Sequence, residues 1–367
     1  MRTYFRLIPR VGFIGLLMGA VFICHASGLA GRVSVIRVPV AGQAVKAMVG
    51  ADGTIHLLLD STQGPRYVKS QDGGRTFSEP MAIVDAASQK PGLKFGAEDL
   101  AIGKDGRVHV AMDNNAWELK MPKEDWALYY ASLAPGAKVF SPVRNLNRKS
   151  SEGFSLAAGD RGEVTAWFLS DKLYIMESRD NGETFTAGRE PDPLWNPCDC
   201  CTTSSTYGAD GRLAVLYREK TDNERDMYVA VMDQSGAVKP VRNRISGTLW
   251  NIAACPMTYF TINRAGNGYV AAWPTKGQVY FARLDKDGGV LPPGEIKTPG
   301  RSGMRNGLLA LSVPDGTTLV AWKNLDVLRW QLYDVKGQPQ GGPGSANSPG
   351  GGAAGVALAD GRFLVFP

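Results

Sequence analysis

Three of the five cysteines in this sequence lie within four consecutive positions. Cys198, Cys200 and Cys201 belong to the segment WNPCDCC, while Cys255 follows later, two residues before Met257. Since a bond between the adjacent Cys200 and Cys201 closes a strained ring, a disulfide from Cys255 to the cluster is one expectation. Thiolates and a thioether also select copper or zinc, and an exposed thiol pair supports redox chemistry. The residue types leave these three possibilities open.

Charged and aromatic residues suited to a polar or anionic ligand lie elsewhere in the chain. Arginine suits a carboxylate because its planar guanidinium donates to both oxygens. Trp117 and Trp126, in the long insertion 113–127, suit stacking against sugar rings. The charged residues that we expect to line a ligand site are Glu98, Glu152, Arg218, Arg225, Asp226 and Arg305.

A repeat of about fifty residues predicts the elements that position these side chains. Each copy has a glycine turn, Asp-Gly in most cases, between short β-rich runs, which is a strong hairpin signal. The turn glycines are Gly53, Gly106, Gly162, Gly211, Gly266, Gly316 and Gly361. Four strands per copy predict an all-β fold, a β-propeller of seven blades, with six blades or a pair of β-sandwiches as alternatives.

The repeat also predicts where the candidate residues lie. The seventh copy stops after two strands, so the strand-like segment 32–40 is expected to complete the last blade and close the ring. Cys200, Cys255 and Arg305 each stand eleven residues before a turn glycine, at the predicted start of an innermost strand. We therefore expect them at one mouth of the central funnel, the rim opposite the glycine hairpins.

Residues 1–30 have the pattern of a secretory signal. Three arginines precede a 14-residue apolar run and then small residues that permit cleavage after Ala26 or Ala30. Lipidation at Cys24 or an uncleaved anchor are the alternatives. Cleavage lowers the formal charge from +6 to +3 and places the remainder, 31–367, in the periplasm or outside the cell. Because the chain has no run of basic residues, we expect no nucleic-acid partner. We also expect no stable membrane span after cleavage, and a monomer.

Two turns contain more than a glycine. The segments 70–77 and 178–185 both read Ser-x-Asp-x-Gly-x-Thr-Phe and resemble the Asp-box, or BNR repeat, of bacterial sialidases. The resemblance implies a propeller, with these turns as structural devices on the face opposite the active site. Segments 232–236, 284–289 and 333–337 look like eroded copies. The matching residues are Ser70, Asp72, Gly74, Thr76, Phe77, Ser178, Asp180, Gly182, Thr184 and Phe185.

A closer resemblance covers the middle of the chain. The segments PCDCC (197–201), 217–230, WNIAACPM (250–257) and 270–273 are similar to a secreted sialidase-like subgroup with a PC-x-CC cluster, although Thr202 replaces a common arginine. The resemblance implies an exported propeller that binds a glycan or a partner protein in its funnel. An exo-alpha-sialidase or related glycoside hydrolase is the enzyme alternative, but Arg37 lies a strand too early for the family's first arginine motif. No nucleophile is assigned.

Overall fold

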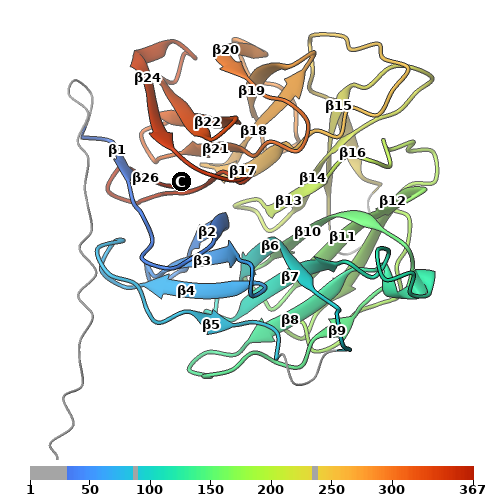
Figure 1. Cartoon of the computed structure of the whole chain (residues 1–367). Coiled ribbons are helices and arrows are strands. Elements are labelled where there is room, and N and C mark those ends of the chain that lie inside the picture. Colours follow the sequence, from blue (N-terminus) through green and yellow to red (C-terminus); the bar gives the residue numbers. More distant parts are fainter. Residues whose placement is uncertain (1–30, 86–89, 234–238) are drawn as a thin grey trace, which may run out of the picture.

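The strands form seven sheets around a central axis (Figure 1). The computed structural model describes residues 31–85, 90–233 and 239–367, so the predicted signal at 1–30 lies outside the described residues. The innermost strands of the seven sheets contact one another in a closed ring. The prediction of an all-β, seven-bladed propeller is confirmed, and the six-bladed and sandwich alternatives are wrong.

Five blades have four strands and follow one order, from the innermost strand outward. Blade 1 comprises β2 (Gln43–Val49), β3 (Ile55–Asp60), β4 (Arg66–Ser70) and β5 (Met81–Ala82); blade 2 comprises β6 (Phe95–Ile102), β7 (Val108–Asn114), β8 (Tyr129–Leu133) and β9 (Arg144–Asn145). Blade 4 comprises β13 (Ser204–Tyr207), β14 (Leu213–Arg218), β15 (Met227–Met232) and β16 (Val241–Arg244). Blade 5 comprises β17 (Thr261–Ala265), β18 (Gly268–Thr275), β19 (Gln278–Leu284) and β20 (Ile296–Arg301); blade 6 comprises β21 (Leu308–Ser312), β22 (Thr318–Asn324), β23 (Val327–Tyr333) and β24 (Pro339–Asn347).

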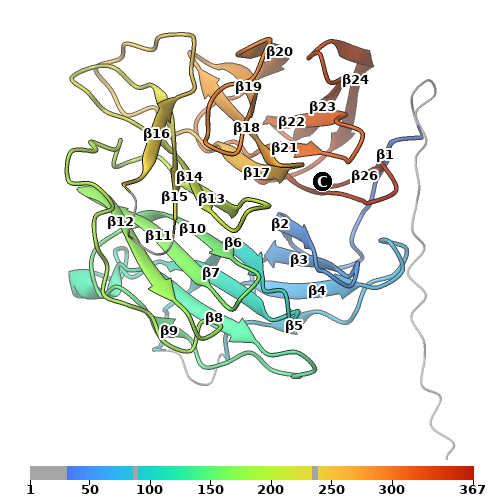
Figure 2. The ribbon, with the colours of Figure 1, turned by 180° about the vertical axis from the view of Figure 1, so that it is seen from behind.

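The other two blades have three strands. Blade 3 comprises β10 (Glu152–Ala158), β11 (Val164–Ser170) and β12 (Lys172–Ser178). Blade 7 comprises β25 (Ala354–Ala357), β26 (Phe363–Phe366) and β1 (Val33–Val35), which lies parallel to β26 (Figure 2). The predicted closure of the ring by the first and last strands is therefore present. In the described ranges, no helix is long and apolar enough to cross a membrane.

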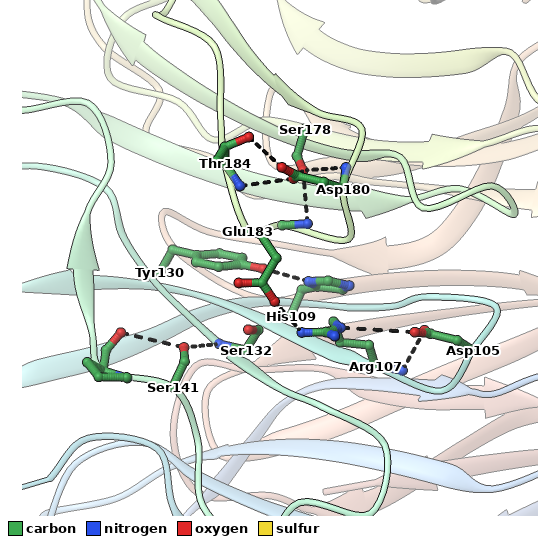
Figure 3. A network of polar contacts seen from close by, with 12 residues as sticks. Asp105, Arg107, His109, Tyr130, Ser132, Ser141, Ser178, Asp180, Glu183 and Thr184 are labelled. Atoms are coloured by element: carbon green, nitrogen blue, oxygen red, sulfur yellow. Dashed lines mark hydrogen bonds and ion pairs between the residues drawn. The ribbon is translucent and has the colours of Figure 1, made fainter.

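The turns at 70–77 and 178–185 are held by the side chain of their own aspartate. Asp180 accepts hydrogen bonds from the Thr184 backbone and the Ser178 hydroxyl, and Asp72 occupies the same position in the first turn (Figure 3). Hydrogen bonds from Thr184 and Ser178 lower the pKa of Asp180 to about 2. For Asp72, burial acts in the opposite direction, but the hydrogen bonds of its turn still lower the pKa to about 2.

The same two turns also join neighbouring blades. Phe185 packs edge-on against Tyr130 of blade 2, and the equivalent Phe77 packs against Phe366 of blade 7. Beside the first contact, Arg107 forms a 2.9 Å ion pair with Glu183 (Figure 3). Each turn therefore fixes the angle between its own blade and the preceding one.

Two of the three eroded copies keep part of this arrangement. Asp285 accepts from the backbone N–H groups of Asp287 and Gly289, and Asp334 accepts from those of Lys336 and Gln338. The third, 232–236, lies partly outside the described residues. The aspartate therefore continues to cap its turn after the rest of the motif has changed.

Candidate functional site

A cavity of about 440 Å³ lies at the centre of the ring, and all seven blades contribute to its wall. We call it the throat. Its charged wall residues come from the inner strands β2 and β6, from the ends of the second strands β3 and β7, and from the segment before β21. They are Lys46, Asp60, Glu98, Asp99, Asp113 and Arg305.

Glu98 is placed in the throat by a β-bulge. In the pairing of β6 with β7, Ala97 lies opposite Met112 and Asp99 opposite Ala111, so Glu98 is the extra residue. Bulges redirect a side chain and are common beside functional sites. The sequence placed Glu98 before the inner strand, whereas the structure places it within β6, because the strand starts earlier, at Phe95.

Three carboxyl groups of the throat, Asp60, Glu98 and Asp113, hold protons more tightly than isolated ones. Burial raises the pKa of Glu98 well above its usual range, and the neighbouring Asp113, Asp99 and Asp60 raise it further, although Arg305 opposes them. Burial and Asp60 likewise raise the pKa of Asp113, while a hydrogen bond with Glu98 lowers it. The raised pKa values of Glu98 and Asp113 favour their protonated forms relative to isolated carboxyl groups, and a protonated carboxyl group can donate a hydrogen bond as well as accept one.

Tyr259 adds a phenol to the same wall. Burial, followed by the charge of Glu98, raises its pKa to about 12, so its hydroxyl remains protonated. Asp99, by contrast, already has partners: Lys46 Nζ lies 3.2 Å from its Oδ1, and the Leu156 backbone N–H of blade 3 donates to Oδ2. Asp99 therefore joins blades, whereas Glu98, Asp113 and Tyr259 are available to a ligand.

A second cavity of about 640 Å³, the outer cavity, adjoins the throat on the side of blades 2 to 5. Its wall includes Trp117, which is 62% exposed, and Trp126, whose indole N–H donates to the Met121 carbonyl. Glu152 and Arg305 also line it. An exposed indole beside carboxylates can stack on a ring while the carboxylates accept hydrogen bonds from its hydroxyl groups.

The predicted charged residues separate into two groups. Glu98, Glu152 and Arg305 line the cavities, but Arg218, Arg225 and Asp226 line neither, and for these three the expected funnel position is corrected. Arg218 is 1% exposed and donates to the carbonyl groups of Arg225 and Pro274. Arg225 and Asp226 are buried as well, and Asp226 pairs with Arg244. These side chains turn inward between blades 4 and 5, where carbonyl groups accept from the terminal guanidinium nitrogens, while the Nε atom of each arginine has no partner.

The cysteines meet at the mouth beside the outer cavity. Cys200 and Cys255 form a disulfide, whereas Cys198 and Cys201 are free and buried. The sulfur atoms of Cys198, Cys200 and Cys201 all lie within 4.8 Å of one another, and Met257 lines the cavity next to them. A hydrogen bond from Cys198, together with the charge of Arg218, lowers the pKa of Cys201 to about 6. The mouth thus holds one disulfide and two buried free thiols, of which Cys201 has the lowered pKa.

Three wall residues were not singled out from the sequence. Asp60 and Asp113 end the second strands of blades 1 and 2 and occupy the same position in their repeats, HLLLD and HVAMD. That recurrence was a usable signal. Tyr259 lies just before β17 and has no such recurrence, so only the folded ring reveals it.

Comparisons with known proteins identify no family. No family model and no curated protein matches the sequence. Among solved structures, a PL25 ulvan lyase has a TM-score of 0.42 at 12% identity over 66% of this chain, and this chain covers only 64% of that lyase. A Fusarium graminearum GH93 alpha-L-arabinofuranosidase has a TM-score of 0.49 at 14% identity, covering 90% of this chain and 98% of that one.

A third solved structure is a lectin. The Aleuria aurantia lectin has a TM-score of 0.48 at 14% identity, covering 85% of this chain and 96% of that one. At these scores and identities the three likenesses carry no inference about activity. The architecture described above is therefore what is established: an all-β propeller of seven blades with a polar throat.

Proposed function

We propose that this protein binds a glycan at the mouth of its funnel, with hydroxyl groups in the throat and a sugar ring against Trp117. The exposed indole of Trp117 at the edge of a carboxylate-lined cavity is the observation that carries the proposal. Carboxylates and the Tyr259 phenol are suitable partners for hydroxyl groups. Stacking on an exposed aromatic ring holds a sugar with little loss of conformational entropy.

The throat favours a neutral ligand over the anionic one that the sequence also allowed. Four carboxyl groups face two cations, and one of these, Lys46, is already paired with Asp99. Among the described wall residues of the two cavities, Arg305 is the single arginine. A sialidase, by family resemblance, would present three arginines to the substrate carboxylate. The sialidase-like assignment therefore has weaker support than glycan binding.

The test is an array of neutral and sialylated oligosaccharides, followed by calorimetry on the best ligand. Trp117→Ala is expected to lower affinity by roughly tenfold, about 1.4 kcal/mol. Asp113→Asn should also weaken binding, whereas Val335→Ala, an exposed site on the opposite rim, should not. No binding above background, or equal affinity of the Trp117 and Val335 variants, would overturn the proposal. A preference for sialylated probes would restore the anionic alternative.

A glycoside hydrolase is the second candidate, because a general acid requires a carboxyl group with a raised pKa, and burial raises the pKa of Glu98 beside Asp113. A panel of aryl glycosides, sialosides included, should then be cleaved by the protein and not by Glu98→Gln. Equal rates for both proteins and a blank would exclude this candidate.

We also propose an exported monomer, with binding of a partner protein as the alternative to a glycan. The Cys200–Cys255 disulfide supports an oxidising compartment. Sequencing of the N-terminus of the secreted protein and light scattering test these points. A first residue after Ala26 or Ala30 and a monomer mass are expected, whereas an intact Met1 in the cytoplasm would contradict export.

A further inference from the structure

The cysteine cluster has nearly the dimensions of a metal site. Cys198 Sγ lies 3.5 Å from Cys200 Sγ, and Cys201 Sγ lies within 4.8 Å of both. Around one metal ion with metal–sulfur bonds of about 2.3 Å, three thiolates lie roughly 4 Å apart. Small side-chain rotations would therefore suffice to place all three sulfurs on one ion.

The disulfide keeps one of these sulfurs occupied. Cys200 is bonded to Cys255, whose residue is exposed at the mouth and so accessible to a reductant. Two thiols of a reductant would cleave the bond, giving Cys200 and Cys255 thiols and one disulfide of the reductant. Reduction thus releases the third sulfur.

Two buried arginines supply the matching charge. Arg218 and Arg225 are 1% and 5% exposed, and neither forms an ion pair with a carboxylate among the described residues. The Nε atom of each is buried without a hydrogen-bond partner. The Cys198 backbone N–H donates to the Arg218 carbonyl, and the Arg218 guanidinium donates to the Arg225 carbonyl, so both arginines lie beside the cluster. Because a buried unpaired charge is costly, these guanidinium groups favour negatively charged sulfur beside them.

We propose that reduction of the Cys200–Cys255 disulfide opens a site for one Cu(I) ion, ligated by Cys198, Cys200 and Cys201. Three thiolates around a monovalent ion have a net charge of −2, which the two arginines balance. Thiolate ligands select Cu(I) or zinc; a four-coordinate structural zinc would also need the Cys255 thiol, which reduction frees but which is exposed at the mouth, whereas Cys198, Cys200 and Cys201 are the sulfurs that lie within 4.8 Å of one another. Met257 beside the cluster can add a thioether, a ligand that favours Cu(I) further.

The experiment uses the full chain, reduced with dithiothreitol, desalted without oxygen and titrated with Cu(I) held by the chelator bathocuproine disulfonate. The reduced protein is expected to take one equivalent, with thiolate-to-copper absorption in the near ultraviolet, and the oxidised protein none. Failure of the reduced protein to compete with the chelator would overturn the proposal. So would tighter binding by the oxidised form.

Two variants separate ligation from folding, because both lack the same disulfide. Cys255→Ser leaves all three proposed ligands and should bind Cu(I) even without a reductant. Cys200→Ser removes one ligand and should bind Cu(I) more weakly than Cys255→Ser by more than about 100-fold. That is more than the usual effect of removing a residue that only hydrogen-bonds to a ligand. Equal affinity of these two variants would overturn the three-sulfur site. Loss of binding in Cys255→Ser alone would instead indicate a four-thiolate zinc-type site and also contradict the proposal.

Discussion

The two rims of the ring use the same chemical group in opposite ways. At the hairpin rim, Asp72 and Asp180 accept hydrogen bonds from their own turns, which keep both carboxyl groups ionised. At the mouth, Glu98 and Asp113 line the throat, where burial raises the pKa of both, the charge of Asp113 raises that of Glu98 further, and the charge of Asp60 raises that of Asp113. The first pair has all of its partners within the chain, whereas the second retains capacity for a ligand.

This contrast distinguishes structural from functional acids. A carboxylate satisfied by nearby N–H groups stabilises the fold and has nothing left to offer a ligand. A carboxyl group whose pKa is raised by burial in a cavity reduces stability above its ordinary pKa and can still exchange a proton, which is typical of functional sites. At the mouth, the Cys200–Cys255 disulfide between blades 4 and 5 offsets this loss of stability. The described part of the hairpin rim contains no disulfide.

The largest effect should come from removing that covalent bond. Cys255→Ser is expected to lower the free energy of unfolding by about 2–4 kcal/mol, because the disulfide joins residues 55 positions apart and restricts the unfolded chain. Urea denaturation measures the change. Wild-type protein in dithiothreitol should unfold at the same midpoint as the variant, and an unchanged midpoint in both would show that the mouth does not depend on the bond.

The next largest loss of stability is expected from substituting a glycine at the hairpin rim. Gly182 and Gly53 both have a φ of 80°, but a Cβ at Gly182 would overlap the Tyr130 hydroxyl, while at Gly53 nothing lies within 4 Å. Gly182→Ala is therefore expected to cost about 3 kcal/mol and Gly53→Ala about 1 kcal/mol. Thermal unfolding compares them. Equal losses would mean that the contact between blades 2 and 3 at this turn is loose.

A smaller, pH-dependent effect is expected at Asp180. The folded pKa of about 2 lies below the ordinary value of 3.8, so the stabilisation is complete above pH 4 and disappears as the pH falls towards 2. Asp180→Asn should lose about 1 kcal/mol at pH 7 and almost nothing at pH 2. Melting curves of the wild type and the variant at both pH values measure this difference in stability. A loss of stability that is the same at pH 7 and pH 2 would exclude ionisation of Asp180 as the cause.

The smallest effect should have the opposite sign and occur at the mouth. Because the pKa of Glu98 is raised in the folded protein, ionisation reduces stability as the pH rises above the ordinary value of 4.5. Glu98→Gln should therefore raise the melting temperature at pH 7 by about 1–3 °C and leave it unchanged at pH 4. A lower melting temperature at pH 7 would show that Glu98 is a structural acid like Asp180.

The sequence predicted the architecture better than the site. Glycine turns at a regular spacing were sufficient for seven blades and for ring closure, because each blade repeats one local pattern. The throat depends on long-range geometry instead: the bulge at Glu98 arises from pairing with β7, and no local pattern encodes it. Similarly, the position of Arg218 at a strand end did not reveal that its side chain turns inward between two blades.

The parallel pairing of β1 with β26 has a consequence for how the protein is made. Val33 finds its partner Phe363 only after residues 34–362 have been synthesised. Until then the backbone N–H and C=O groups of β1 lack their partners in β26. Contacts between residues so far apart in the sequence also form slowly. A nascent chain can therefore form blades 1 to 6 in order of synthesis. The ring closes only in a later step, when β1 pairs with β26 in blade 7.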